Sequence, residues 1–334
     1  MKKLLFLMIL ITSGMETNIA MSTGNTDEIL SKEGNIAVRY SHITTDESVR
    51  HMVNHPAFKG FGRYLLPRDN GTSDYDRPLN QVGSLMPYHD HVDPNIVVGA
   101  INHMIDQVDD GGTIFYNFYS EQQKREDPAK ASTGLFFFKG QPGAPVAIVS
   151  PGGGFTYVGS LHEGFPVAMT LSQKGFNAFV LRYRTGGGLR ASEDLAAAIS
   201  YVFKNADSLG VSVADYSLWG GSAGARMVGN IALHGTVGFG GDDLPKPCIV
   251  VIAYTGHTIF SENFPPTFIV VSEDDGIVHV PTVDRRVENL RNAGIEVDYS
   301  KYKNAGHGFG LGVGTDAEGW IEHATQFWEK YLSE

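Results

Sequence analysis

One serine has the surroundings of a catalytic nucleophile. Residues 220–224 read Gly-Gly-Ser-Ala-Gly, after a strand pattern at 216–219 and before a helical pattern at 223–233. A strand, a sharp turn at serine and a helix form a nucleophile elbow, in which small neighbours relieve backbone crowding. The N-terminus of the helix adds a positive field where an oxyanion would form. We therefore predict that Ser222 is a nucleophile; a glycine-rich turn that merely contains serine is the alternative.

A run of three glycines predicts the oxyanion hole. Residues 151–155 read Pro-Gly-Gly-Gly-Phe and follow an apolar strand pattern at 146–150. We expect backbone N–H groups of Gly153, Gly154 and Ala223 to face the developing negative charge. The sequence leaves open which two of the three glycines donate. No Gly-Lys-Ser/Thr follows, so a nucleotide-binding loop is not expected.

Two residues near this loop are expected to line the substrate pocket. Phe155 directly follows the glycines, and His162 lies in Ser-Leu-His-Glu-Gly at 160–164, at the start of a helix. The alternative for the second segment is a helix cap that involves Glu163.

The general base is predicted from its place after the last strand. His307 lies in Asn-Ala-Gly-His-Gly-Phe at 304–309, and a glycine-flanked loop can bring an imidazole to the serine. His257 and His279 follow earlier strands and lie in less suitable loops. His307 is therefore the expected base.

The acid is expected after the penultimate strand, where three carboxylates compete. They are Glu273, Asp274 and Asp275, and Asp275 is favoured because it precedes a turn glycine at the loop apex. The chain order of nucleophile, acid and base differs from the orders of chymotrypsin and subtilisin.

From residue 113 onward, apolar strand patterns alternate with helical ones. This alternation predicts an α/β fold with a mostly parallel, doubly wound sheet flanked by helices. Ser192 is expected to cap one helix, and further helices are expected at 281–293 and 316–332. The strands are expected at 114–119, 135–139, 146–150, 178–182, 216–219, 248–253, 267–272 and 297–302.

The first 112 residues predict two further parts. Residues 1–20 have the features of a signal peptide: two lysines, an apolar run at 4–11 and a small-residue cleavage site. This predicts a secreted or periplasmic protein with no membrane attachment after cleavage; a short buried N-terminal helix is the alternative. Residues 21–112 are expected to form an extension that packs on or near the mouth of the active site, with helices near 47–64 and 95–108.

Charge and cysteine usage exclude some classes of partner and bond. The formal net charge is −11 and no Lys/Arg-rich run follows the N-terminus, so nucleic acid is not an expected partner. Cys248 is the only cysteine, so no intramolecular disulfide can form.

Residues 113–332 resemble the α/β-hydrolase fold. The Pro-Gly-Gly-Gly-Phe, Leu-Arg-Tyr-Arg, Gly-Gly-Ser-Ala-Gly and Gly-His-Gly-Phe motifs resemble esterases related to acetylxylan esterases and to hormone-sensitive-lipase-like carboxylesterases. Two departures stand out: Pro151 replaces the family's histidine, and Ser272 replaces the glycine of Gly-x-x-Asp-x-x-Val. The spacing from Asp275 to Val278 matches that motif and further favours Asp275 as the acid.

Together these features predict a serine carboxylesterase without a cofactor. Residues 254–266 are too short for a large lid, which favours short acyl groups, and the resemblance implies acetyl esters of plant polysaccharides or their oligosaccharides. A feruloyl esterase is the close alternative, with Tyr64, Tyr75 and Tyr88 as an aromatic wall. A non-catalytic binding protein of the same fold is a more distant one.

A metal-dependent hydrolase is the remaining alternative. Residues 89–93 read His-Asp-His-Val-Asp, which resembles a metallo-β-lactamase motif, but Pro94 stands where the final histidine should be. No metal site is therefore expected, and a polar loop of the extension is the favoured interpretation.

Overall fold

The computed structural model describes residues 28–30, 36–68 and 73–333, and the chain divides into two compact units, 1–41 and 42–334. In the first unit, strands β1 (Glu28–Leu30) and β2 (Ile36–Val38) pair antiparallel. The expected signal peptide at 1–20 lies outside the described residues. Residues 42–112, which the sequence assigns to an extension, share the second unit with the sheet.

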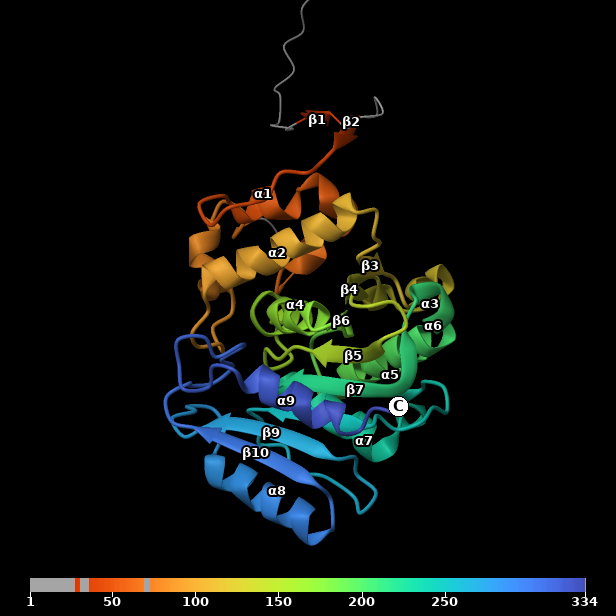
Figure 1. Cartoon of the computed structure of the whole chain (residues 1–334), viewed down its shortest axis with the longest axis vertical. Helices are drawn as coiled ribbons and strands as arrows, with labels where there is room; N and C mark the ends of the chain where they lie inside the picture. Colours follow the sequence, from red (N-terminus) through yellow and green to blue (C-terminus); the bar gives the residue numbers. More distant parts are fainter. Residues whose placement is uncertain (1–27, 31–35, 69–72, 334) are drawn as a thin grey trace, which may run out of the picture. The chain divides into compact units, whose positions relative to one another are not determined.

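The second unit is organised around one mixed sheet of eight strands (Figure 1). Its order is β10-β9-β8-β7-β5-β6-β4-β3, and the pairs from β10 through β6 are all parallel. The two strands at the other edge, β4 and β3, run antiparallel to their neighbours. The carboxyl ends of the parallel strands therefore meet at one edge of the sheet, where ligands bind in such folds. The strands are β3 (Phe115–Tyr116), β4 (Gly134–Phe138), β5 (Pro145–Ser150), β6 (Asn177–Arg182), β7 (Ser212–Gly221), β8 (Ile249–Ala253), β9 (Thr267–Ser272) and β10 (Val297–Tyr302).

Apolar side chains alternate between the two faces of the sheet. Val250 and Ile252 of β8 pack in the hydrophobic cluster that also holds the inner faces of α5, α7 and α8. Trp219 of β7 points to the other face, where its ring meets Trp320 and Trp328 of α9. Helices therefore cover both faces, as the continuous apolar strands predict. The helices are α4 (Phe165–Gln173), α5 (Gly188–Lys204), α6 (Ala206–Leu209), α7 (Ala223–His234), α8 (Val280–Asn292) and α9 (Trp320–Glu329).

The predicted fold class is confirmed, but several element boundaries are wrong, among them the helix expected at 316–332, which covers only 320–329. The strand expected at 114–119 is reduced to the two residues of β3. The helix expected to begin at Ser192 begins at Gly188, and Ser192 is buried inside it, where its hydroxyl accepts a hydrogen bond from Asn230. Serine at this position therefore links two helices instead of capping one.

Residues 42–112 form short helices around one long one. The helix expected over 47–64 is broken into α1 (Val49–Val53), η1 (Pro56–Phe58) and η2 (Gly62–Leu65), because Pro56 starts a new turn and Gly60 adopts a φ of 92°. The turn η3 (Leu79–Leu85) follows, and α2 (Pro94–Asp109) begins where Asp93 caps its first turn. Helix α2 packs on α4, so these residues form a third layer over one face of the sheet (Figure 1).

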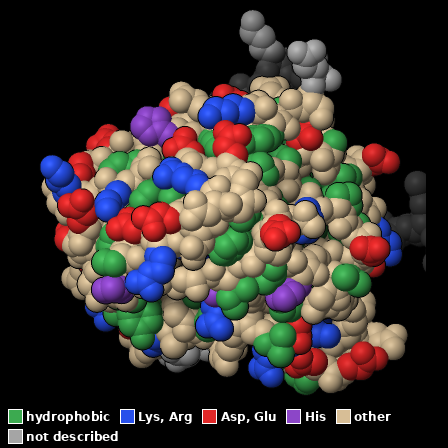
Figure 2. Space-filling view, turned by 90° about the horizontal axis from the view of Figure 1, so that it is seen from below, with side chains coloured by type: hydrophobic (Ala, Val, Ile, Leu, Met, Phe, Trp, Pro, Cys, Tyr) green, Lys and Arg blue, Asp and Glu red, His purple; other side chains and the backbone are tan. Residues whose placement is uncertain are grey.

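The remaining short helices lie beside the antiparallel edge of the sheet. They are α3 (Glu121–Glu126) and η4 (Pro128–Ser132), which connect β3 to β4. Among the helices that the structure describes, none is both long and apolar enough to cross a bilayer. On the face shown in Figure 2, acidic and basic side chains are interspersed with apolar ones.

Candidate active site

Ser222 lies at the turn between β7 and α7, at the carboxyl edge of the sheet. Its φ of 47° and ψ of −111° are unusual for a residue with a side chain, as expected where a strand turns sharply into a helix. Glycine is required on both sides of this turn. A Cβ on Gly221 would overlap the Glu163 carboxylate, and one on Gly224 would overlap the Ser150 carbonyl.

The structure brings Ser222, His307 and Asp275 into one hydrogen-bonded chain. The Ser222 hydroxyl lies 3.0 Å from Nε2 of His307, and Nδ1 of His307 lies 2.8 and 3.0 Å from the two Asp275 carboxylate oxygens. Asp275 also accepts hydrogen bonds from the N–H groups of Ile277 and Val278, which fix its carboxylate. With neutral His307, the Asp275 contact places the proton on Nδ1 and leaves Nε2 free to accept the serine proton.

The neighbouring carboxylates do not contact His307. Asp274 is exposed and accepts hydrogen bonds from the Ser272 hydroxyl and the Gly306 N–H. The Ser272 hydrogen bond, helped by that of Gly306, lowers the pKa of Asp274. Asp274 thus ties the loop after β9 to the loop that carries His307, and only Asp275 of the three candidates reaches the imidazole.

The glycine loop, residues 151–155, has two backbone N–H groups near the serine that form no hydrogen bond within the described chain. The N–H of Gly152 donates to Glu163 at 2.7 Å, so it is not available to a ligand. Gly153 and Gly154 adopt φ values of 120° and 61°. Within the described chain, the N–H groups of Gly153, Gly154 and Ala223 donate to no other group. The geometry therefore leaves these three donors available for an oxyanion.

A buried carboxylate behind the loop was not recognised from the sequence. Glu163 accepts hydrogen bonds from Gly152, from the Tyr254 hydroxyl at 2.6 Å and from Nε2 of His89. Burial alone would raise the pKa of Glu163, but His89 and Tyr254 stabilise the carboxylate and lower its pKa to about 2. The sequence suggested a helix cap for this segment, whereas Glu163 lies in the turn η5 (Ser160–Gly164) and faces inward.

The partner of Glu163 comes from the N-terminal 112 residues. His89 is buried, and its other nitrogen, Nδ1, lies 2.9 Å from the Tyr157 hydroxyl. The next residue, Asp90, accepts a hydrogen bond from the His307 N–H, while its own N–H donates to the His307 carbonyl. Residues 89–90 therefore support both the glycine loop and the loop that carries the base.

The first two residues of the motif at 89–93 thus support this site, while Asp93 caps α2. Among the described residues, no group of three or more histidine, cysteine or acidic side chains is arranged to hold a metal ion.

The two residues expected to contact substrate lie in different surroundings. Phe155 is half-buried beside the glycine loop and adopts a φ of 58°. His162 is 5% exposed, and its Nε2 is hydrogen-bonded to the Gly308 carbonyl at 3.0 Å. Burial lowers the pKa of His162 to about 4, so its ring is neutral near pH 7. His162 lies behind the His307 loop, where it supports the backbone.

Of the three tyrosines considered as an aromatic wall, one lies beside the glycine loop. Tyr88 is 40% exposed, its ring stacks on Tyr157, and it approaches within 3.0 Å of the Cβ position of Gly154. Tyr64 stacks on Phe115 under the antiparallel edge, and Tyr75 lies beneath Arg50.

Comparison with known proteins gives a family match and two curated relatives. Residues 253–334 match the model of the prolyl oligopeptidase family. Endo-1,4-beta-xylanase B of Butyrivibrio fibrisolvens is 27% identical over 220 residues, which cover 52% of this chain and 34% of the relative. Acetylxylan esterase of Xylanibacter ruminicola is 25% identical over 218 residues, which cover 56% of this chain and 45% of the relative. The match therefore spans less than half the length of each relative.

Solved structures give the fold. An acetyl ester-xyloside bifunctional hydrolase from Caldicellulosiruptor lactoaceticus aligns with a TM-score of 0.57 at 20% identity, covering 65% of this chain and 95% of that one. The enzyme MGS-M1, an α/β hydrolase from a deep-sea metagenome library of the Medee basin, aligns with a TM-score of 0.52 at 22% identity, covering 60% and 92%. The sheet and its helices thus have the arrangement of an α/β hydrolase.

Proposed function

We propose that this chain, which has the α/β-hydrolase fold, is a serine ester hydrolase that removes short acyl groups from carbohydrates. One observation carries the proposal. The His307 imidazole lies between the Ser222 hydroxyl and the Asp275 carboxylate, at hydrogen-bond distance from both. These contacts position the three side chains for proton transfer. A protein of this fold that only binds ligands would not need them.

The geometry supports a two-step acyl transfer. His307 takes the proton of Ser222 through Nε2, and the serine oxygen attacks the ester carbonyl to form a tetrahedral intermediate. The unengaged N–H groups of Gly153, Gly154 and Ala223 stabilise its oxyanion. His307 then protonates the leaving alcohol, and the same imidazole later activates a water that releases the acid. Asp275 holds the proton on Nδ1 throughout and stabilises the imidazolium.

The choice of acetylated carbohydrate rests on similarity and on loop length. One curated relative is named an acetylxylan esterase, and one structural neighbour an acetyl ester-xyloside hydrolase. The connection between β8 and β9, residues 254–266, is short, so no large lid covers the site from this loop. Residues 1–20 favour export, and an exported enzyme would meet polysaccharide outside the cell.

A feruloyl esterase is a second candidate, favoured by Tyr88 alone. Its exposed ring beside Gly154 could stack on an aromatic acyl group. Ferulate release from a feruloylated sugar, compared with acetate release from acetylated xylan, decides between the two acyl groups.

The test of the mechanism uses p-nitrophenyl acetate and three variants. We expect Ser222→Ala to lose at least about 10³-fold in kcat. The activity of the wild type should not change when a metal chelator is added. Asp275→Asn should lose about 10⁴-fold, while Asp274→Asn, which keeps its exposed position, should lose far less. Full activity of Ser222→Ala would refute the proposal, and loss only in Asp274→Asn would reassign the acid.

A further inference from the structure

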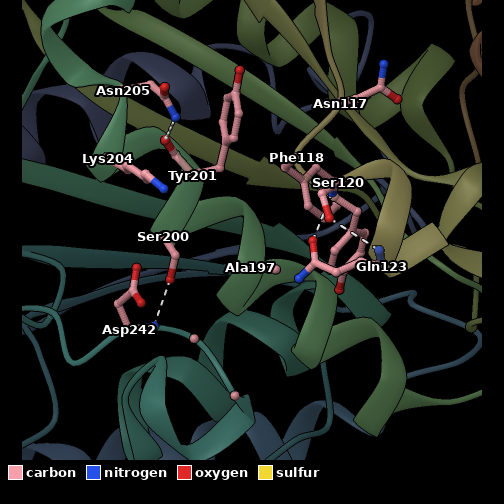
Figure 3. Close-up of a pocket in the computed structure, with 13 residues that line it drawn as sticks. Asn117, Phe118, Ser120, Gln123, Ala197, Ser200, Tyr201, Lys204, Asn205 and Asp242 are labelled. Carbon is pink, nitrogen blue, oxygen red and sulfur yellow. Dashed lines mark hydrogen bonds between the residues drawn. The ribbon is translucent and has the colours of Figure 1, made fainter. Parts of the chain in front are cut away.

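Two adjoining cavities, one of them drawn in Figure 3, lie along the outer side of α5, and neither is lined by a residue of the triad. Each has a volume of about 470 Å³. They form one groove, because four residues line both: Tyr119, Gln123, Ala197 and Gly240.

The floor of this groove is one face of α5. Leu189, Glu193, Ala197 and Tyr201 line it at intervals of four residues, and this spacing places their side chains on the same side of a helix. A helix of 17 residues is about 25 Å long, so the groove follows a path of that order. Such a length suits an extended chain better than a single small molecule.

One end of the groove opens beside the candidate active site. Leu189 is 68% exposed at the start of α5. Its neighbour Gly188 places its Cβ position 3.2 Å from the ring of Phe155, which belongs to the glycine loop. A chain attached to an acyl group at Ser222 could therefore continue past Phe155 and Leu189 onto α5.

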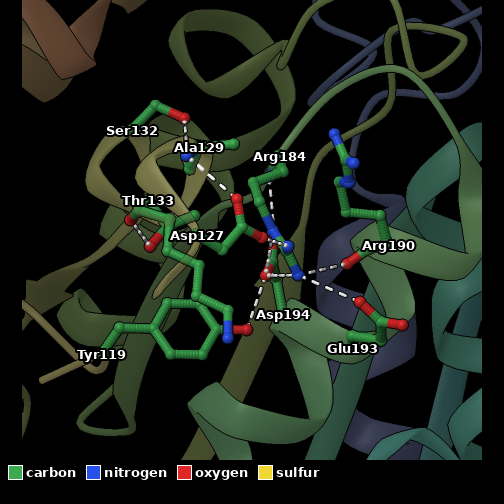
Figure 4. A network of polar contacts seen from close by, with 10 residues as sticks. Tyr119, Asp127, Ala129, Ser132, Thr133, Arg184, Arg190, Glu193 and Asp194 are labelled. Carbon is green, nitrogen blue, oxygen red and sulfur yellow. Dashed lines mark hydrogen bonds and ion pairs between the residues drawn. The ribbon is translucent and has the colours of Figure 1, made fainter. Parts of the chain in front are cut away.

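The charges in the groove balance. Arg184 is bonded to Asp127, Glu193 and Asp194, so its charge is compensated (Figure 4). The lining holds three cationic side chains and three carboxylates: Lys130, Arg184 and Lys204, with Asp127, Glu193 and Asp242. A balanced lining of this kind favours an uncharged ligand that is rich in hydrogen-bonding groups.

The far end of the groove combines an aromatic ring with side-chain amides. Figure 3 shows the half-buried Tyr201 standing between Asn117 and Lys204, with Gln123 on the opposite wall. The loop at 240–242 is fixed against α5, because the Asp242 N–H donates to the Ser200 hydroxyl at 2.8 Å. Sugar rings stack their C–H faces on aromatic rings, and their hydroxyls bond to amides.

We propose that this groove binds the sugar chain of an acylated oligosaccharide whose acyl group is held at Ser222. The inference rests on the proposed function and adds to it a second binding region along α5. A peptide is the less favoured occupant, because the nearby sheet edge, β3, has two residues and offers little backbone for strand addition.

The test compares substrates of different length in variants of Tyr201. For the wild type, we expect kcat/KM on acetylated xylo-oligosaccharides to rise from two to six sugar units. Tyr201→Ala should lower it about 5–10-fold on the longest substrate, through KM, and leave p-nitrophenyl acetate hydrolysis unchanged. Tyr75→Ala, another half-buried tyrosine that lines a different cavity, is the matched control and should change neither. If Tyr201→Ala does not fold, exposed Lys204→Ala should show a smaller effect of the same kind.

A binding measurement separates this inference from the proposed function. Ser222→Ala should bind unacetylated xylohexaose in calorimetry, and adding Tyr201→Ala should weaken that binding. Such binding, with neither acetate nor ferulate released by the wild type, would support the groove and refute the esterase function. Acetate release that is independent of chain length and of Tyr201 would overturn the groove and keep the function. Binding of extended peptides in place of xylohexaose, lost in Tyr201→Ala, would also overturn it.

Discussion

The His89–Glu163 pair and the cluster around Arg184 both hold polar side chains inside the same unit, but they differ in the number of partners. Both side chains of the pair are almost fully buried, at 1% and 2% exposure, and among the described residues each forms its one ion pair with the other. Arg184 is equally buried, yet it contacts three carboxylates, of which Asp127 and Glu193 are 35% and 43% exposed (Figure 4).

Because of this difference, the pair should be sensitive to substitution, whereas the cluster should tolerate the loss of one carboxylate. Removing either member of the pair leaves a buried polar group without its partner, which is costly. Removing one of the partly exposed carboxylates, Asp127 or Glu193, from the cluster leaves Arg184 with two others, and such a pair is worth little. The pair also contacts the glycine loop through Gly152, whereas the cluster lies beneath the groove along α5. We therefore expect changes in the pair to affect the reaction and changes in the cluster to affect mainly stability.

Of the changes in the pair and the cluster, Glu163→Ala is expected to have the largest effect. It removes the acceptor of the Gly152 N–H and of the Tyr254 hydroxyl, so the glycine loop loses the contact that orients its next two N–H groups. Misplacing or losing one oxyanion donor costs about 10²–10³-fold in kcat. Steady-state kinetics on p-nitrophenyl acetate should show a fall in kcat of about 10²-fold with KM little changed. Glu163→Gln, which retains an acceptor oxygen, should recover part of the loss.

Glu193→Ala is the matched control in the cluster. Its carboxylate is one of three around Arg184, so kcat on p-nitrophenyl acetate should stay within twofold of the wild type. Equal losses of kcat in Glu163→Ala and Glu193→Ala would show that the two networks do not differ in this way.

The next effect is on stability, in His89→Asn. Breaking a buried pair by removing one partner costs about 3–5 kcal/mol, because the other charge stays buried. Urea unfolding should show this loss, and a double-mutant cycle with Glu163→Gln should give a coupling of more than about 1 kcal/mol. His51→Asn is the control: this histidine is 48% exposed beside Glu47, and its loss should change stability by less than about 0.5 kcal/mol.

Local patterns predict the three residues of the proposed triad, and the structure brings these residues within hydrogen-bond distance of one another. Ser222 stands out because the strand, the turn and the helix are adjacent in sequence. Asp275 and His307 follow from topology, since successive parallel strands deliver their following loops to one edge. The fold class follows from the alternation of strand and helix patterns, although the predicted length of a short element such as β3 is too great.

The pair behind the triad could not be predicted, because its partners meet only in the folded chain. His89 and Glu163 are 74 positions apart, and Asp90 contacts His307 across 217 positions. Neither segment has a residue periodicity that predicts these contacts. The concentration of polar residues at 89–93 was a visible signal, but it resembled a metal motif more closely than a support for a loop.

A pH titration sharpens the comparison, because a buried histidine lies next to the pair and none lies in the cluster. Burial lowers the pKa of His162 from 6.5 to about 4. Between these values the unfolded chain binds a proton that the folded chain does not, so stability falls as pH falls from about 6.5 to 4. The loss from this group amounts to at most about 3 kcal/mol. Glu163, with its pKa near 2, remains charged over that window and adds nothing to the slope until pH falls below about 4.5.

His162→Gln tests this assignment. Glutamine can still donate to the Gly308 carbonyl but does not titrate, so the variant should have a flatter dependence of its unfolding free energy on pH between 6.5 and 4. His257, whose pKa burial also lowers to about 4, should account for part of the slope that remains. An unchanged slope in His162→Gln would show that this histidine does not contribute.

The smallest effect is expected for Asp127→Asn in the cluster. The substitution removes one charge facing Arg184 but keeps the side-chain oxygen that accepts from the Ala129 N–H at the start of η4. Because Asp194 and Glu193 remain, the expected loss of stability is about 0.2–1 kcal/mol, the range of partly exposed ion pairs. High salt should reduce the difference from the wild type, since a partly exposed pair is screened. A loss above about 3 kcal/mol, independent of salt, would mean that Arg184 depends on Asp127 alone and that the cluster is not redundant.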